Sequence, residues 1–158
     1  MALDFVPGPP ALETVTSPGG HWSLDIAVVP GARTGFAQGT MRHRGVVAWR
    51  HGLAAPTRPR FAVVADDGAA ALFGCWDNIP RDVSIEILAP SGARRGLLEE
   101  PAIVRAVGVP MREIVAVARH GVWLDRVPRM QGGLVWLGSA GRALVLDLED
   151  GTLRAAPG

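Results

Sequence analysis

The side chains of this chain that could do chemistry are few, and their spacing matches no catalytic motif. Its four histidines, His21, His43, His51 and His120, lack the close pairs, such as H-x3-H, that zinc sites use. His51 and His120 each directly precede a glycine, where a turn favours a polar residue, so we interpret them as turn residues. A role as ligand or general base is the alternative for these histidines.

The two candidate nucleophiles, a cysteine and a serine, also lie in no known catalytic motif. Cys75, the single cysteine, lies beside Trp76, and we expect it to pack as a small hydrophobic residue. Ser139 stands in Gly-Ser-Ala-Gly, which departs from the G-x-S-x-G spacing of a nucleophile elbow and fits a hairpin turn. The sequence also lacks a P-loop and an H-E-x-x-H pair. We therefore predict no catalytic residue, no metal ligand and no cofactor.

The placement of charge is the most informative feature of the sequence. The net charge is only +1, yet residues 26–65 contain six arginines and no acidic residue. Guanidinium groups bind carboxylates and phosphates in a bidentate manner, so a basic face in this stretch is suited to an acidic partner. The alternative is that acidic segments elsewhere pair with it across strands. The predicted partner-binding residues are Arg33, Arg42, His43, Arg44, Arg50, Arg58 and Arg60.

Composition limits the class of protein. The chain has 158 residues, of which 48% are hydrophobic, so it can bury enough apolar surface to fold. Its 20 glycines and 13 prolines predict many short elements joined by tight turns. No apolar run of about 18 residues is present, and the N-terminus lacks the pattern of a signal peptide. We expect a cytoplasmic protein without membrane contact.

Alternating apolar residues predict antiparallel strands. Trp22–Val28 alternates with a period of two, which indicates one buried face. Phe61–Ala65 and Ala69–Trp76 flank Asp-Asp-Gly, a strong hairpin signal. A helix fits best at Leu97–Val107, although Pro101 disfavours it. Further strands are predicted at Val46–Trp49, Val83–Ile87, Glu113–Ala118, Val122–Leu124, Leu134–Leu137 and Leu144–Leu148.

The predicted strands and turns recur along the chain. Phe61–Leu72 resembles Ile114–Leu124, and Ile87–Leu97 resembles Val135–Val145. This pattern indicates three degenerate units of roughly 40 to 50 residues, the period expected of four-stranded propeller blades. We predict a mainly β chain of antiparallel meanders in one domain, 1–158. Residues 1–16 form an N-terminal tail or leading strand, and the units span about 17–56, 57–100 and 110–156.

Two segments carry a resemblance to a known class. Ser17–Trp22, with the sequence SPGGHW, and Val64–Gly68, with the sequence VADDG, resemble the strand-turn motifs of propeller-type bacterial proteins. The resemblance covers about residues 60–98 and 113–153, and it implies architecture without implying an activity. Three units are fewer than the four or more blades of typical propellers. We therefore expect an open partial propeller, a sandwich, or a half-propeller that pairs with a second copy.

These observations favour a non-enzymatic protein-binding module. A β scaffold rich in loops, arginine and tryptophan can cover a partner's surface, as an inhibitor or a toxin-neutralising immunity protein does. The expected partner is a protein with an acidic surface, and a homo-oligomer is also compatible with the sequence. One alternative is nucleic-acid binding through residues 33–60, where aromatic residues are sparse. Another is a small hydrolase or carbohydrate-binding protein that uses tryptophans with His21 or His120.

Overall fold

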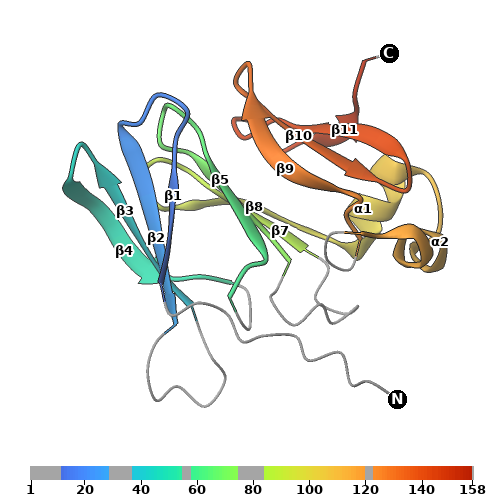
Figure 1. Cartoon of the computed structure of the whole chain (residues 1–158), viewed down its shortest axis with the longest axis horizontal. Helices are drawn as coiled ribbons and strands as arrows, with labels where there is room; N and C mark the ends of the chain where they lie inside the picture. The colour runs from blue at the N-terminus through green and yellow to red at the C-terminus, as the bar shows by residue number, and fades with distance from the viewer. Residues whose placement is uncertain (1–11, 29–36, 55–57, 75–83, 120–122, 158) are drawn as a thin grey trace.

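The computed structural model describes residues 12–28, 37–54, 58–74, 84–119 and 123–157. It shows a mainly β chain with three four-stranded sheets and two short helices (Figure 1). Every pair of neighbouring strands within a sheet is antiparallel.

Each sheet is a meander whose strands lie in chain order. Sheet 1 contains β1 (Leu12–Thr16), β2 (Trp22–Val28), β3 (Ala37–His43) and β4 (Val46–Gly52). Sheet 2 contains β5 (Phe61–Val64), β6 (Ala70–Phe73), β7 (Ser84–Leu88) and β8 (Arg94–Glu99). Sheet 3 contains β9 (Arg126–Gln131), β10 (Leu134–Ser139), β11 (Arg142–Leu146) and β12 (Leu153–Ala155).

The first strands of the three sheets lie next to one another. β5 contacts both β1 and β9, so these strands form the inner side of the molecule, and β4, β8 and β12 are the far edges of their sheets. The sheets diverge from this inner side like successive blades (Figure 1). Within the described ranges they do not close into a ring. The predicted mainly β fold, an open partial propeller of three blade-like units, is confirmed.

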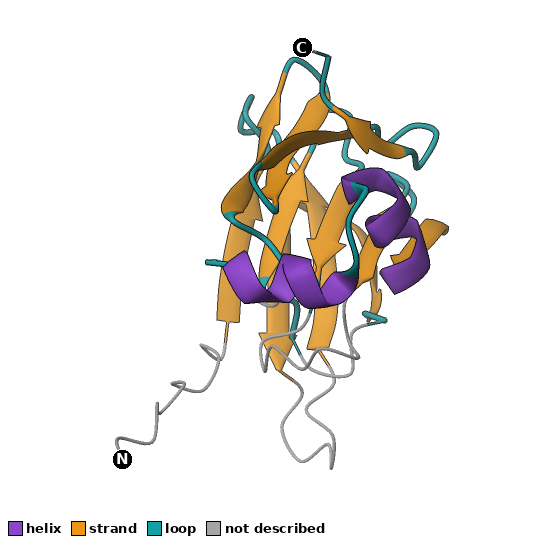
Figure 2. Ribbon diagram, turned by 90° about the vertical axis from the view of Figure 1, so that its right-hand side faces the viewer, coloured by secondary structure: helices purple, strands orange, loops and turns teal. Residues whose placement is uncertain are grey.

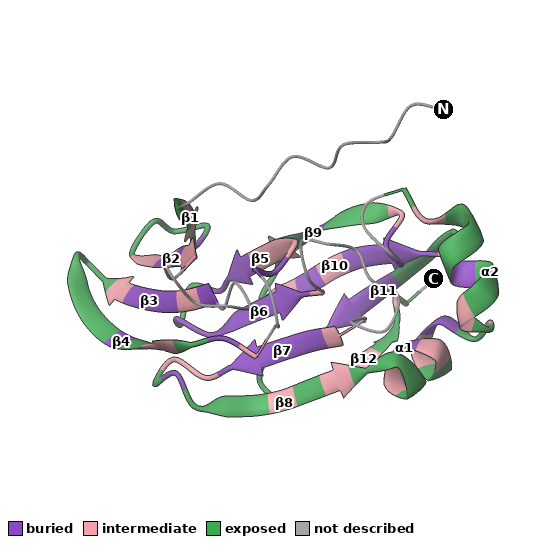
Figure 3. Cartoon of the chain, turned by 90° about the horizontal axis from the view of Figure 1, so that it is seen from below, coloured by how far each residue is buried: buried purple, intermediate pink, exposed green. Residues whose placement is uncertain are grey.

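Sheet 2 is the middle layer, and its central strands β6 and β7 are buried on both faces, whereas its edge strand β8 is largely exposed. Ala70 and Leu72 of β6 face sheet 1, where they pack in one apolar cluster with Leu24 and Met41. The alternate residues of β6, including Phe73, pack in a second cluster with β10, β11 and the helices. All four residues of β6 are therefore buried, which explains its continuous apolar run. Figure 3 shows β6 and β7 as the most buried strands.

Two short helices connect sheet 2 to sheet 3 and lie across the strands in Figure 2. Helix α1 covers Glu100–Val107 and helix α2 covers Met111–Val117. Pro101 lies in the first turn of α1, where its missing N–H costs nothing, so it favours the helix that we expected it to disfavour. No helix among the described residues is long and apolar enough to cross a bilayer.

The predicted strand at Glu113–Ala118 is wrong, because α2 occupies this segment. A run of apolar residues this short fits either a strand or a helix, and only packing decides between them. Ile114 is the buried residue of α2, while Val117 is 53% exposed. The predicted strand at Val122–Leu124 is also absent over its described part, where Leu124 makes only an isolated bridge.

The hairpin turn between β5 and β6 is as predicted. Gly68 has a φ of 92°, which favours glycine, and the Asp67 carboxylate accepts a hydrogen bond from the Ala69 amide at 2.9 Å. The β10–β11 hairpin also matches its prediction, with Ala140 and Gly141 both at positive φ. Strands β3, β9 and β12 were not expected from their sequences. The helix predicted from Leu97 begins only at Glu100, because residues 97–99 pair with β7 as the end of β8.

Candidate functional site

The structure describes six of the seven residues predicted to bind a partner. Arg33 lies outside the described residues, as do Cys75, Trp76 and His120. Residues 42–50 belong to β3, β4 and the turn between them, whereas Arg58 and Arg60 precede β5. The structure thus separates the predicted set into two groups with different surroundings.

Arg58 is fully buried and forms an ion pair with Glu13 of β1. Burial lowers the pKa of this guanidinium from its ordinary value. Because the pair links the segment before β5 to the inner strand of sheet 1, it fastens sheet 2 to sheet 1. Arg60 is half-buried, and its backbone N–H donates to Phe73 O at 2.9 Å. Arg58 therefore offers no surface to a partner.

Arg42 projects from the outer face of sheet 1, the face opposite sheet 2. It forms an ion pair with Asp25 of the neighbouring strand β2. The Asp25 carboxylate also accepts a hydrogen bond from the Thr14 hydroxyl at 2.7 Å. The alternative weighed from the sequence, neutralisation of the basic stretch by acidic strands, thus holds for Arg42 and Arg58.

Arg44 and Arg50 are the exposed arginines of the described part of this stretch. Arg44 occupies the turn of the β3–β4 hairpin, with a φ of 51°, and Gly45 follows with a φ of 83°. Two consecutive residues at positive φ are typical of the tight turn that joins twisted strands. Arg50 lies on β4, where its Nε donates to Thr40 Oγ1 at 3.1 Å.

His43 and His51 stack on tryptophans of sheet 1. The rings of Trp22 and His43 have centroids 4.2 Å apart, and those of Trp49 and His51 are 4.4 Å apart. The Nε2 atom of His51 lies 2.8 Å from Gly92 O in the β7–β8 turn. His51 thus joins β4 to sheet 2. Among the described residues, no group of three or more histidine, cysteine or acidic side chains is arranged to hold a metal.

The far edge of sheet 1 is its most accessible part. Val46 and Val47, at the start of the predicted strand Val46–Trp49, are 71% and 48% exposed. Within the described residues β4 pairs only with β3, so the other side of its backbone is available for hydrogen bonding. Figure 3 shows β4 as mostly exposed. Arg44 and Arg50 lie on the same hairpin and give this edge a positive charge.

The comparisons with known proteins support the fold alone. The chain is similar to the crystal structure of HIRA(644-1017), with a TM-score of 0.56 and 15% sequence identity. The match covers 93% of this chain and 38% of that chain. A structure of BamB from Moraxella catarrhalis matches 89% of this chain and 47% of that one at 12% identity, with a TM-score of 0.38. The chain thus spans less than half the length of either protein.

The resemblance to β-propeller proteins agrees with the blade-like sheets described above. No protein-family model and no curated protein matches the sequence. Propellers support many unrelated functions, so the site must be argued from the residues of this chain.

Proposed function

We propose that this chain is a protein-binding module that takes an acidic, extended segment of a partner along β4. The exposed edge of β4, with Val46, Val47 and the arginines of the same hairpin, is the observation that carries the proposal. An extended segment added to a sheet edge gains affinity from backbone hydrogen bonds and specificity from alternate side chains.

The charge of the hairpin selects the partner. Arg44 and Arg50 are exposed, and residues 26–65 contain no acidic residue of their own. Carboxylates of the bound segment could therefore pair with these guanidinium groups, since this stretch has no carboxylate of its own that would compete for them. An inhibitor or an immunity protein that covers an acidic partner is one form that this module could take.

Nucleic-acid binding is less well supported. Phosphate backbones are held by several basic residues along a track. Here Arg42 and Arg58 already pair with Asp25 and Glu13, and Trp49 is buried. A stretch with two exposed arginines in its described part and no exposed aromatic ring on β4 favours a short acidic peptide segment over a nucleic acid.

Selection from a random peptide library displayed on phage tests this proposal with the full chain as the target. We expect the selected peptides to carry acidic residues and to bind the variant with Arg44→Glu and Arg50→Glu at least about tenfold more weakly. Arg112→Glu on α2, which is also exposed, is the matched control and should bind like the original protein. Thermal melting of all three proteins separates lost binding from lost folding.

Backbone pairing is tested on the best selected peptide. Methylation of every second peptide nitrogen removes the hydrogen bonds that one side of the strand can donate. Two peptides are compared, one methylated at the odd and one at the even positions, and we expect one of them to lose binding and the other to keep it. The proposal fails if both methylated peptides bind equally, if the selected peptides lack acidic residues, or if single-stranded DNA binds more tightly than they do.

A further inference from the structure

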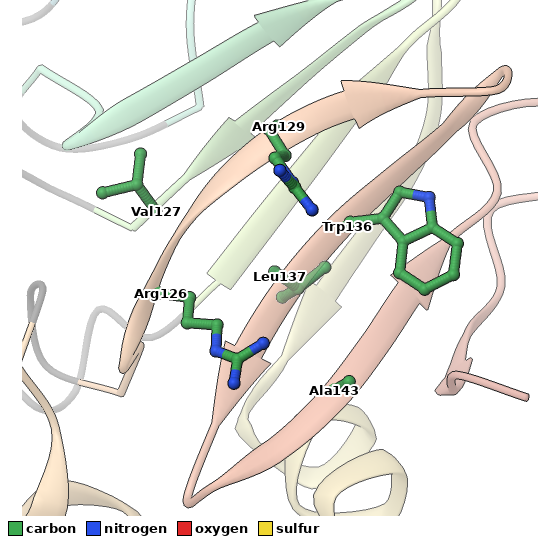
Figure 4. A pocket seen from close by; sticks show the side chains of 6 residues that line it. All are labelled: Arg126, Val127, Arg129, Trp136, Leu137 and Ala143. Carbon is green, nitrogen blue, oxygen red and sulfur yellow. The ribbon is translucent and has the colours of Figure 1, made fainter. Parts of the chain in front are cut away.

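The outer face of sheet 3, opposite the core, carries a hollow of about 340 Å³. It lies over β9, β10 and β11, and Figure 4 shows the guanidinium group of Arg129 near the indole of Trp136 and that of Arg126 farther along the same face. We call it the Arg-Trp hollow. It is lined by Arg126, Val127, Arg129, Trp136, Leu137 and Ala143.

A bulge in β9 brings the two arginines onto one face. Residues three apart in a regular strand point to opposite sides of the sheet. The register between β9 and β10 shifts between the pairs Arg129–Trp136 and Arg126–Gly138, so three steps on β9 oppose two on β10. A bulge of this kind redirects a side chain. Arg126 thereby joins Arg129 in the Arg-Trp hollow instead of facing away from it.

Gly138 makes room for one of these arginines. A Cβ at position 138 would first meet Oδ1 of Asp125, and it would lie 2.9 Å from Cγ of Arg126 and 3.0 Å from its Cδ. The missing side chain lets the stem of Arg126 lie across β10, toward the position of Ala143 in Figure 4. The bulge in β9 and the glycine at position 138 thus both help to place the exposed guanidinium of Arg126.

Neither arginine of the hollow has an ion pair with a described residue. Asp125, the adjacent carboxylate, accepts a hydrogen bond from the Gly141 amide at 2.5 Å. Arg154, which lies in the same cross-strand row as Arg129, donates to the Thr152 hydroxyl at 3.4 Å. Arg126 and Arg129 are the charged residues that line the hollow, and they give it its positive charge.

The spacing of the arginines specifies the geometry of a ligand. Arg126 and Arg129 stand opposite Gly138 and Trp136, which are two residues apart on β10 and therefore about 7 Å apart along the strand. Carboxylates at positions i and i+2 of an extended peptide have the same separation and lie on the same side. We propose that the Arg-Trp hollow binds an extended acidic segment of a partner protein with the pattern Glu-x-Glu, independently of the β4 edge.

A second copy of this chain is a poorer occupant. Joining two copies end to end would place sheet 1 of one copy against the Arg-Trp hollow of the other. The outer face of sheet 1 carries Arg42 and Arg50, and its Asp25 is already paired with Arg42. Like charges would then meet across the interface, whereas a Glu-x-Glu segment supplies the missing opposite charges.

Immobilised twelve-residue peptides test the proposal with the full chain. One set contains Glu-Ser-Glu within varied apolar flanks, a second contains Glu-Glu-Ser in the same flanks, and a third replaces both glutamates by glutamine. We expect binding to peptides of the first set, at least about tenfold weaker binding to the other two, and a similar loss for the double variant Arg126→Gln and Arg129→Gln. Arg112→Gln, which removes one charge from α2, should bind normally.

The variant Gly138→Val provides a test that keeps both charges. It should weaken binding of the Glu-Ser-Glu set, because the new side chain would meet both Asp125 and the stem of Arg126 and would displace the guanidinium. Melting of each variant shows whether it is folded. Equal binding of the three peptide sets overturns the proposal, and so does an unchanged affinity of the folded double variant. Tighter binding of a twelve-residue thymidine oligonucleotide would assign the hollow to nucleic acid. Self-association lost in the double variant would assign it to a second copy.

Discussion

The indole of Trp22 lies directly against the backbone of Gly68. A Cβ at position 68 would stand 2.7 Å from ring carbons Cε3 and Cζ3 of Trp22. Gly92 of the β7–β8 turn has the same relationship to Trp49, at 2.7 Å from its Cγ. Each tryptophan also stacks on a histidine. The two tryptophan–histidine stacks of sheet 1 therefore pack against two glycine-containing turns of sheet 2. These contacts determine how closely the first two sheets approach each other.

Gly68→Ala should destabilise the protein by about 3 kcal/mol, because the methyl group meets the Trp22 ring and the residue has a φ of 92°. Gly45→Ala isolates the backbone contribution, since Gly45 has a φ of 83° but open space around it, and it should cost only about 1 kcal/mol. Chemical denaturation of both variants measures the difference. Equal losses would show that the contact with Trp22 contributes nothing.

Glu13→Gln should destabilise the protein by roughly 2 kcal/mol, because it removes the negative charge that pairs with the buried Arg58 guanidinium. The cost stays below that of a wholly buried pair, since the Glu13 side chain is 40% exposed. Urea denaturation gives the free energy of unfolding. Asp67→Asn, at an exposed position on the neighbouring turn, serves as the comparison; a loss no larger than that of Asp67→Asn would contradict a structural role for the pair.

Arg142→Gln should weaken the end of helix α1. The Arg142 Nη1 atom donates to Val107 O at 2.7 Å, and Gly108, with a φ of 83°, leaves the space that this guanidinium occupies. A cation that caps the last carbonyls of a helix contributes about 1 kcal/mol. Hydrogen exchange of the α1 amides should accelerate in this variant and much less in Arg105→Gln, whose side chain is exposed in the same turn. Equal acceleration of exchange in the two variants would show that loss of positive charge explains the effect and that the hydrogen bond from Arg142 to Val107 does not.

Thr152→Ala should raise the pKa of Asp150. Hydrogen bonds from the Thr152 hydroxyl and backbone amide, at 2.6 and 2.9 Å, hold this pKa below its ordinary value. A lowered folded-state pKa gives stability that is present above the unfolded pKa and is lost as the pH falls through the folded one. NMR titration of the Asp150 carboxyl carbon measures the change. Arg154→Gln should raise the pKa less, and the opposite order would contradict this account.

The pattern of apolar residues predicted many strands of this fold, because a strand that buries one or both of its faces has a regular pattern of apolar residues. Trp22–Val28 alternates because sheet 1 buries one face, whereas β6 is apolar throughout because sheet 2 lies between two neighbours. The turn glycines were equally readable, since Gly68 and Gly141 adopt backbone angles that other residues resist. The short apolar segment at 113–118 has no pattern that separates a strand from a helix, and it forms part of helix α2.

The candidate sites were harder to predict, because the partner of a charged side chain is decided by distant segments. The six arginines of residues 26–65 looked alike in sequence, yet Glu13 and Asp25 neutralise two of them across 45 and 17 positions of chain. Arg126 and Arg129 were not predicted to share a site, and a spacing of three places residues of a regular strand on opposite faces. Pro128 lies between them, and strands accept proline at edges and bulges, but only the pairing with β10 shows that a bulge forms here.

By itself, the sequence determined the strands whose apolar residues alternate or run together, several of the tight turns, and the division into three similar units, because each of these follows from local residue types and their period. Tertiary structure alone decided which arginines remain exposed and which faces stay open. Ion pairing and burial depend on residues far apart in the chain, and a sheet's free face depends on what packs beside it.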